Sequence, residues 1–273
     1  MLRARVITAL VLLAVLLSVA FSQSFVFFAL VAAAFFGAAA WESFRLFRNM
    51  QPVIGAALWT AAFVSIVFKG DASHATLLFA ICAAIWALRL APSLAFGLPP
   101  VDSFANRLLS GIYGIAVLGC FIAITALFQH SPLYLLSVMS LVWIADIGAY
   151  FAGKAFGKHK LAPSISPGKS WEGVIGGWLA VLTIAAITVL SPPLVDTFAA
   201  KLQQKWGWFG FALVMTLLVA ASIAGDLFES QLKRRVAMKD SSNLLPGHGG
   251  VLDRVDALIP TLPLAVLFDL ALR

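Results

Sequence analysis

The chain has 273 residues, of which 62% are hydrophobic and only 11% are charged, and its mean hydropathy is +0.98. This composition excludes an ordinary water-soluble domain. The formal net charge of +7 favours attraction to anionic lipid head groups and anionic substrates. It does not indicate nucleic-acid binding, because no basic helix or aromatic-basic face stands clear of the apolar segments.

Apolar runs long enough to cross a bilayer as helices recur along the whole chain. We therefore expect an all-α integral membrane protein, a polytopic bundle of about nine transmembrane helices. The expected spans are 5–21, 24–44, 52–68, 75–94, 108–128, 132–156, 174–190, 209–232 and 255–270. The first is either a full span or a short, re-entrant segment, because almost no connection separates it from the second. We interpret it as a retained anchor rather than a cleaved signal peptide.

The distribution of basic residues predicts the orientation. With nine spans and a cytoplasmic N-terminus, all but four of the 19 Lys and Arg residues lie on the cytoplasmic side; the exceptions are Lys69, Lys201, Lys205 and Arg273. We expect a bacterial inner (plasma) membrane protein whose active site faces the cytoplasm. The chain is interpreted as one membrane domain, 1–273, in which helices of 1–110 act as a scaffold and 111–273 form the catalytic region.

One acidic residue lies inside an otherwise apolar helix. Asp146 follows Leu141-Val142-Trp143-Ile144-Ala145, and a carboxylate in that setting costs several kcal/mol unless it is paired or coordinated. Asp146 is therefore either a member of a polar site or a structural link between helices.

The loop 157–173 contains Gly168-Lys169-Ser170, which resembles the end of a phosphate-binding Walker A motif. That motif requires a glycine where Pro163 stands, so this interpretation fails. A basic loop that enters a helix near Ser170 still suits phosphate binding at the helix N-terminus. Lys169 is the favoured ligand, whereas Lys158 and Lys160 are explained as orientation signals.

A charged stretch near the C-terminus carries the strongest chemical signal. Asp226, Glu229 and Lys233 are spaced to share one helix face, and Asp253 and Asp256 repeat the spacing of three. These acids could surround a divalent cation, or each could pair with a neighbouring base, and both arrangements can coexist. Carboxylates beside bases predict a phosphoryl- or nucleotidyl-transfer site.

Two long motifs resemble those of a known family, the phosphatidate cytidylyltransferases, also called CDP-diacylglycerol synthases. The first runs Ser230-x-Leu232-Lys233-Arg234, Lys239-Asp240, Leu245-Pro246-x-His248-Gly249-Gly250-Val251-x-Asp253-Arg254-Val255-Asp256. The second combines Asp146-x-Gly148-Ala149-Tyr150-x-x-Gly153 with Ser166-Pro167-x-Lys169-Ser170-x-Glu172-Gly173. The first 110 residues resemble the family only in being apolar helices.

The resemblance implies a reaction in which CTP and phosphatidic acid give CDP-diacylglycerol and pyrophosphate. It also implies a requirement for Mg²⁺, a role in phospholipid synthesis, and a homodimer. The lipid phosphomonoester has a second pKa of about 6, so near neutral pH it is already a nucleophile and needs charge shielding rather than a strong base.

We assign residues to this reaction as a hypothesis. Asp226, Asp253, Asp146, Asp256 and Glu229 are the expected ligands of Mg²⁺, with room for a second cation. The expected substrate-binding residues are Lys169, Lys233, Arg234, Lys239, Arg254, Ser166, Gly249 and Gly250. Catalysis is assigned to Asp226, Asp253, Lys169 and His248, where His248 either donates to a phosphate oxygen or to the leaving group, or only stabilises its turn by a hydrogen bond.

Two other functions are compatible with these residues. A CTP-dependent lipid kinase, or a cytidylyltransferase for another lipid phosphate, would use a similar site. A transporter would use the intramembrane acids as ion sites, but the charges gather at one end of the expected bundle and no two-halves symmetry is visible.

Overall fold

The computed structural model describes residues 8, 10–11, 14–15, 18–19, 22, 24–70 and 72–272, without side chains at 72–74. The expected first span, 5–21, lies largely outside the described residues. The described part of the chain contains eight helices that are long and apolar enough to cross a membrane, and the protein is an integral membrane protein. Their bounds match the other expected spans closely, except that the span expected at 209–232 begins at Phe198.

Most of the long helices follow one another with short connections, and the longer connections are 157–170, between α7 and α8, and 236–251, between α9 and α10. They are α2 (Phe25–Leu46), α3 (Pro52–Lys69), α6 (Phe104–His130), α7 (Pro132–Phe156), α8 (Trp171–Val189) and α9 (Phe198–Arg235). The span Ala75–Phe96 combines α4 (Ala72–Ile85), a π-helical turn (Trp86–Leu90) and α5 (Ala91–Phe96). The last span combines α10 (Leu252–Val255) and α11 (Leu258–Leu272), and a short 3₁₀ turn covers Pro192–Leu194.

Serine side chains set the starts of four helices. Ser24, Ser103, Ser131 and Ser170 each accept a hydrogen bond from a backbone N–H in the first turn of α2, α6, α7 and α8. Such caps satisfy N–H groups that have no partner inside the helix. The helices therefore begin directly after the serines, which for α6 and α8 is a few residues before the expected spans and for α2 and α7 is within one residue of them.

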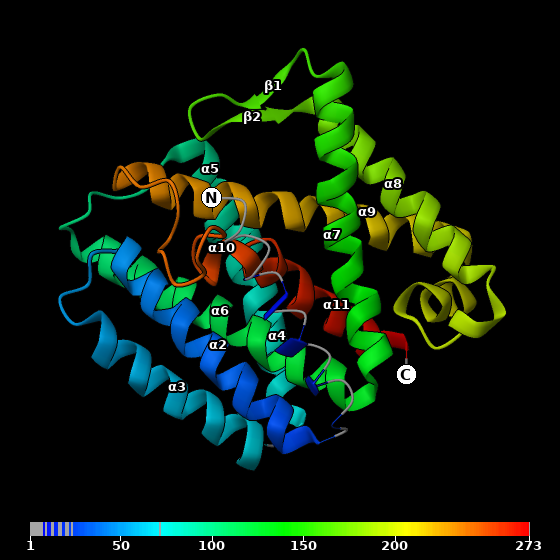
Figure 1. Ribbon diagram of the computed structural model, residues 1–273, viewed down its shortest axis with the longest axis horizontal. Helices are drawn as coiled ribbons and strands as arrows, with labels where there is room; N and C mark the ends of the chain where they lie inside the picture. Colours follow the sequence, from blue (N-terminus) through cyan, green and yellow to red (C-terminus); the bar gives the residue numbers. More distant parts are fainter. Residues whose placement is uncertain are drawn as a thin grey trace.

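Helix α11 lies at the centre of the bundle, where it packs against α4, α6, α7 and α9 (Figure 1). Helices α2 and α3 pack together on one side, while α7 and α8 pair on the opposite side, shown in green and yellow-green (Figure 1). The short helix α10 also contacts α2. The N-terminal helices and the C-terminal charged stretch are therefore neighbours in space.

Helix α9 is longer than the expected span 209–232, because a first segment from Phe198 continues into it through a kink at Gly207. Gly207 has φ 68°, a conformation that glycine adopts without strain. A polar group lies at this end of the helix, where Asp196 pairs with Lys201 at 2.7 Å and with His130 at 3.1 Å. Hydrogen bonds from Lys201 and His130 hold the pKa of Asp196 below its usual range.

The expected loop 157–173 contains a small antiparallel hairpin, which adds two strands to an otherwise helical protein. Strands β1 (Lys160–Ala162) and β2 (Ser166–Ser170) pair with Lys160 opposite Ser170. Glu172 at the start of α8 accepts hydrogen bonds from the backbone of Lys158 and from the His159 ring, the latter at 2.6 Å. The hairpin is therefore tied to the start of α8, and in Figure 1 it extends to the left from the upper end of α7.

Glycines allow α7 and α8 to approach closely. A Cβ atom at Gly177 of α8 would collide with the carbonyl oxygen of Ala145 on α7, and one at Gly148 of α7 would lie 2.8 Å from the Cβ of Ala180. Small residues at such positions let transmembrane helices pack through their backbones. This contact also fixes the position of Asp146, which follows Ala145.

We expect Gly177→Ala to destabilise the protein by about 1–3 kcal/mol, because the obstructing atom is backbone and cannot move aside. The matched control is Gly111→Ala in α6, where an added Cβ meets no atom within 4 Å. That change should be neutral or stabilise by up to about 1 kcal/mol, since alanine favours helix more than glycine. Thermal unfolding of both variants in detergent makes the comparison, and equal melting temperatures would contradict the close packing.

Candidate active site

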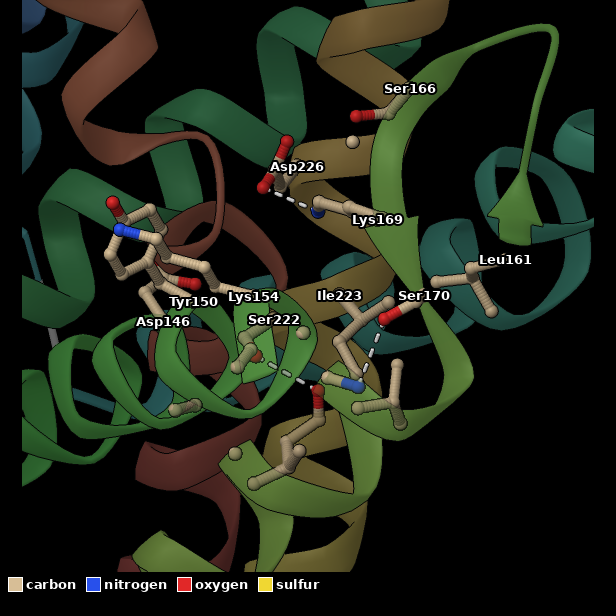
Figure 2. Close-up of a pocket in the computed structure, with 18 residues that line it drawn as sticks. Asp146, Tyr150, Lys154, Leu161, Ser166, Lys169, Ser170, Ser222, Ile223 and Asp226 are labelled. Atoms are coloured by element: carbon tan, nitrogen blue, oxygen red, sulfur yellow. Dashed lines mark hydrogen bonds and ion pairs between the residues drawn. The ribbon is translucent and has the colours of Figure 1, made fainter. Parts of the chain in front are cut away.

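A cavity of about 490 Å³ lies between α7, α8, α9 and strand β2. Its walls are mostly small or apolar, and its charged lining residues are Asp146, Lys154, Lys169 and Asp226, with Ser166 among the polar ones. Figure 2 shows the Lys169 side chain reaching from β2 toward Asp226 of α9, with Ser166 beside them. Residues that are far apart in the sequence therefore meet in one pocket.

Lys169 and Asp226 form an ion pair, and each side chain is roughly a quarter exposed. The hairpin places Lys169 by pairing β2 with β1, and Ser170 directly after it caps α8. Asp226 also accepts a hydrogen bond from Ser230 one helical turn later, at 3.3 Å. A base and an acid held at the edge of an apolar cavity can interact with a charged substrate group that enters it.

Asp146 lines the same cavity and is exposed to it. Its carboxylate interacts electrostatically with Asp226, Lys169 and Arg254. Within the part of the chain that the structure describes, no hydrogen bond or ion pair to the Asp146 side chain is formed. The geometry therefore favours a place in a polar site over the alternative of a structural link between helices.

A second group of charges lies further along α9. Lys233 forms ion pairs with Glu229, one turn earlier in the helix, and with Asp253 at 2.6 Å. The Glu229 side chain is fully buried, and that of Lys233 is 12% exposed. The three residues predicted to share one helix face therefore do not act together. Asp226 pairs with Lys169, whereas Glu229 and Asp253 both pair with Lys233. In this structure the Lys233 ammonium is engaged by protein acids.

Asp253 organises the loop that precedes it. One carboxylate oxygen accepts hydrogen bonds from the backbone N–H of Ser241 at 2.9 Å and of Gly250 at 2.7 Å, and from the Ser241 hydroxyl at 2.9 Å. The other oxygen binds Lys233. Both oxygens are therefore occupied by protein donors, and a role for Asp253 as a cation ligand stays a prediction that requires some of these bonds to be exchanged.

Asp256 connects the two groups of charges. It interacts electrostatically with Asp226 and Lys169 of the first group and with Lys233 of the second. Its backbone carbonyl lies against Gly225, where a Cβ atom would collide with it. The four predicted aspartates and Glu229 are thus arranged along one connected region rather than around a single point.

The remaining predicted residues lie on or near the loop 236–251. Arg234, Lys239 and Arg254 are exposed. The backbone N–H of His248 donates to the Leu245 carbonyl at 2.8 Å, while its ring Nδ1 is buried and has no hydrogen-bond partner among the described residues. The turn is therefore held by its backbone and not by the imidazole. A contact between His248 and a substrate phosphate stays a prediction.

Glycines shape the end of this loop. Gly249 has φ 81°, and a Cβ atom there would lie 2.6 Å from the Asp253 carboxylate. At Gly250 a Cβ atom would collide with Ser241 and with Glu42 of α2. Both positions require glycine for packing, and their contact with substrate stays a prediction.

The carboxylates of the cavity fit an Mg²⁺ ion that is bound by only one or two protein side chains. Among the described residues, no three Asp, Glu, His or Cys side chains are gathered closely enough to hold a metal ion between them. Mg²⁺, however, is commonly bound by one or two carboxylates together with waters and substrate phosphates. Asp146 and Asp226 line one cavity beside Ser166, and their carboxylates are groups of this kind.

Glu42 is the residue that sequence reasoning missed. It lies in α2, is fully buried, and accepts hydrogen bonds from residues about 200 positions later. The signal was present, because Glu42 is a carboxylate in the apolar run Ala38-Ala39-Ala40-Trp41-Glu42, as Asp146 is in its own helix.

A model of the cytidylyltransferase family matches residues 3–271, and the chain belongs to this family. Two bacterial relatives are similar along almost their whole length, and both are named phosphatidate cytidylyltransferase. The protein of Haemophilus influenzae is 37% identical over 96% of both chains. That of Pseudomonas aeruginosa is 43% identical over 96% of this chain and 95% of its own. A Bacillus subtilis protein of the same name is 39% identical over 57% of this chain and 54% of its own.

Proposed function

We propose that this protein transfers the cytidylyl group of CTP to phosphatidic acid, releasing pyrophosphate and forming CDP-diacylglycerol. The bond between the α- and β-phosphates of CTP breaks, and a new bond joins the lipid phosphate oxygen to the α-phosphorus. The supporting observation is the Lys169–Asp226 pair, held with Asp146 at the edge of an apolar cavity between membrane helices. Such a site suits a substrate that has a charged head and apolar chains.

The two substrates approach from different sides in this proposal. The lipid phosphate lies at Lys169, and the first part of its glycerol backbone lies along the apolar walls from α7, α8 and α9. The nucleotide approaches from the loop 236–251, where Lys239, Arg234 and Arg254 are exposed and can bind its phosphates. The lysine and arginine charges offset the repulsion between the lipid dianion and the triphosphate, which is the main obstacle to their reaction.

We further propose that Asp146 and Asp226 hold Mg²⁺, with Asp256 close by and with phosphate oxygens completing the coordination. When bound, the cation would neutralise charge on the triphosphate and orient it. Lys169 then contacts the lipid phosphate while Asp226 keeps its ammonium in place. The nucleophile is already ionised near neutral pH, so no residue is required as a strong base.

The cellular setting is also proposed here. The basic residues near Lys233 support a site that faces the cytoplasm, and the bacterial relatives support a plasma membrane location. A homodimer is proposed from the family resemblance alone, and cross-linking in native membranes would test it.

Separately labelled CTP tests the reaction directly. The detergent-purified protein is incubated with phosphatidic acid and CTP that carries label in either the α- or the γ-phosphate, with and without Mg²⁺. We expect α-label to enter the lipid and γ-label to leave as pyrophosphate, in a Mg²⁺-dependent manner. Transfer of γ-label to lipid would instead indicate a kinase. If no lipid acceptor reacts, ion transport through the intramembrane acids would become the function to test.

A further inference from the structure

A fully buried carboxylate of the N-terminal half binds the loop near the C-terminus. One oxygen of Glu42 in α2 accepts hydrogen bonds from the Ser242 hydroxyl and from the backbone N–H of Val251 at 3.1 Å. The other accepts from the Ser241 hydroxyl at 3.2 Å and from the backbone N–H of Leu252 at 2.6 Å. Glu42 thus joins both ends of the segment 241–252.

This arrangement is specific to a carboxylate. Each Glu42 oxygen accepts from one backbone N–H and one serine hydroxyl, and the Ser241 hydroxyl shares its single proton between Glu42 and Asp253. A glutamine would have to turn its NH₂ group toward one pair of donors, and the backbone N–H in that pair cannot become an acceptor. The absence of a side chain at Gly250 is explained by the same contact, because a Cβ atom there would collide with Glu42.

The segment that Glu42 holds forms one wall of a second cavity, of about 450 Å³. Trp41 and Arg45 of α2 line its other wall, opposite Lys239, Asp240 and Ser242. The Arg45 guanidinium lies 4.8 Å from the centre of the Trp41 ring. Glu42 lies between these two residues in the sequence and points inward to the loop, so it sets the distance between α2 and the lysine-bearing side of the cavity.

We propose that Glu42 is a positioning residue for the nucleotide. It fixes the segment 241–252 so that Lys239 faces α2 across the second cavity and Asp253 keeps its bonds to Ser241 and Gly250. This inference rests on the proposed function, in which Lys239 binds the phosphates of CTP. Residues 239–252 do not line the cavity assigned to the lipid. Loss of Glu42 should therefore weaken the use of CTP and leave the use of phosphatidic acid unchanged.

The test compares Glu42→Gln with the wild-type protein in the labelled-CTP assay. We expect the KM for CTP to rise about tenfold or more, because charge-assisted hydrogen bonds are lost, while the KM for phosphatidic acid stays within about twofold. Two controls change buried polar groups that form no hydrogen bond to the segment 241–252. Ser43→Ala removes a neighbouring buried hydroxyl that has no partner among the described residues, and Asp269→Asn changes another buried acid. Both controls should retain the wild-type KM for CTP.

A double-mutant cycle separates positioning from general stability. Ser242→Ala alone should raise the KM for CTP by about threefold, and it should add little in the Glu42→Gln background, because its effect acts through Glu42. Additive effects, an equal rise in both KM values, or no change would overturn the proposal. If Glu42→Gln does not fold, Ser242→Ala alone tests the proposal: it should raise the KM for CTP and leave the KM for phosphatidic acid unchanged. An inactive wild-type protein would instead refute the proposed function.

Discussion

Asp226→Asn is expected to lower kcat for cytidylyl transfer by about 10²- to 10³-fold, the size of loss that follows removal of one group that stabilises transition-state charge. The substitution keeps the shape of the side chain but removes the negative charge that holds Lys169. It also removes one of the two carboxylates that line the cavity with oxygen ligands. Initial rates with saturating CTP and phosphatidic acid give the comparison, and the melting temperature verifies that the variant is folded.

The chain offers a matched control at the opposite end of the same helix. Asp196 pairs with Lys201 near the start of α9, much as Asp226 pairs with Lys169. Asp196→Asn should leave the rate of transfer within about twofold of wild type, because a surface ion pair contributes little and lies far from the cavity. If Asp226→Asn kept more than about a tenth of the activity, the central role given to this carboxylate would be wrong.

Lys233→Met should destabilise the protein by about 3–5 kcal/mol, the cost of leaving a buried ion pair without one partner. Glu229 is fully buried and is paired with Lys233, and Asp253 also loses its ion pair in this variant. Methionine is similar in size to lysine, so the loss reflects charge rather than a cavity. Thermal or denaturant-induced unfolding in a single detergent measures the change.

Two further variants separate this effect from the general cost of replacing a lysine. Lys201→Met removes the exposed ion pair at the other end of α9 and should cost less than about 1 kcal/mol. Adding Glu229→Gln to Lys233→Met should restore a large part of the lost stability, because the buried negative charge is removed with its partner. No restoration in the double variant would show that Glu229 does not bear an unpaired charge after Lys233 is lost.

The helices were predictable because the physics that places them is local. A run of about 20 apolar residues must form a helix in a bilayer, since every backbone polar group needs a partner within the segment. The exact starts depended on capping serines such as Ser131 and Ser170. The hairpin within 157–173 was missed because its strands are short and carry no alternating apolar pattern.

The sequence indicated which residues lie near the candidate site better than it indicated which of them form ion pairs with each other. Sequence reasoning proposed that Asp146, Lys169 and Asp226 converge, and they line one cavity. It placed Asp226, Glu229 and Lys233 on one face, yet Asp226 binds Lys169 while the other two bind each other. Periodicity shows which side chains share a helix face, but it cannot show which neighbouring element meets each of them.

The sequence by itself determined that this protein lies in a membrane as a helical bundle, because the composition and length of each apolar segment are enough to predict a transmembrane helix. It also identified the cytidylyltransferase family, because long motifs of charged and glycine residues are specific. Only the tertiary structure decided that Glu42 of α2 holds the loop 241–252, and that Asp253 is enclosed by Lys233, Ser241 and Gly250. Those contacts join segments up to about 200 residues apart, and they depend on how the bundle closes around α11 rather than on any local pattern.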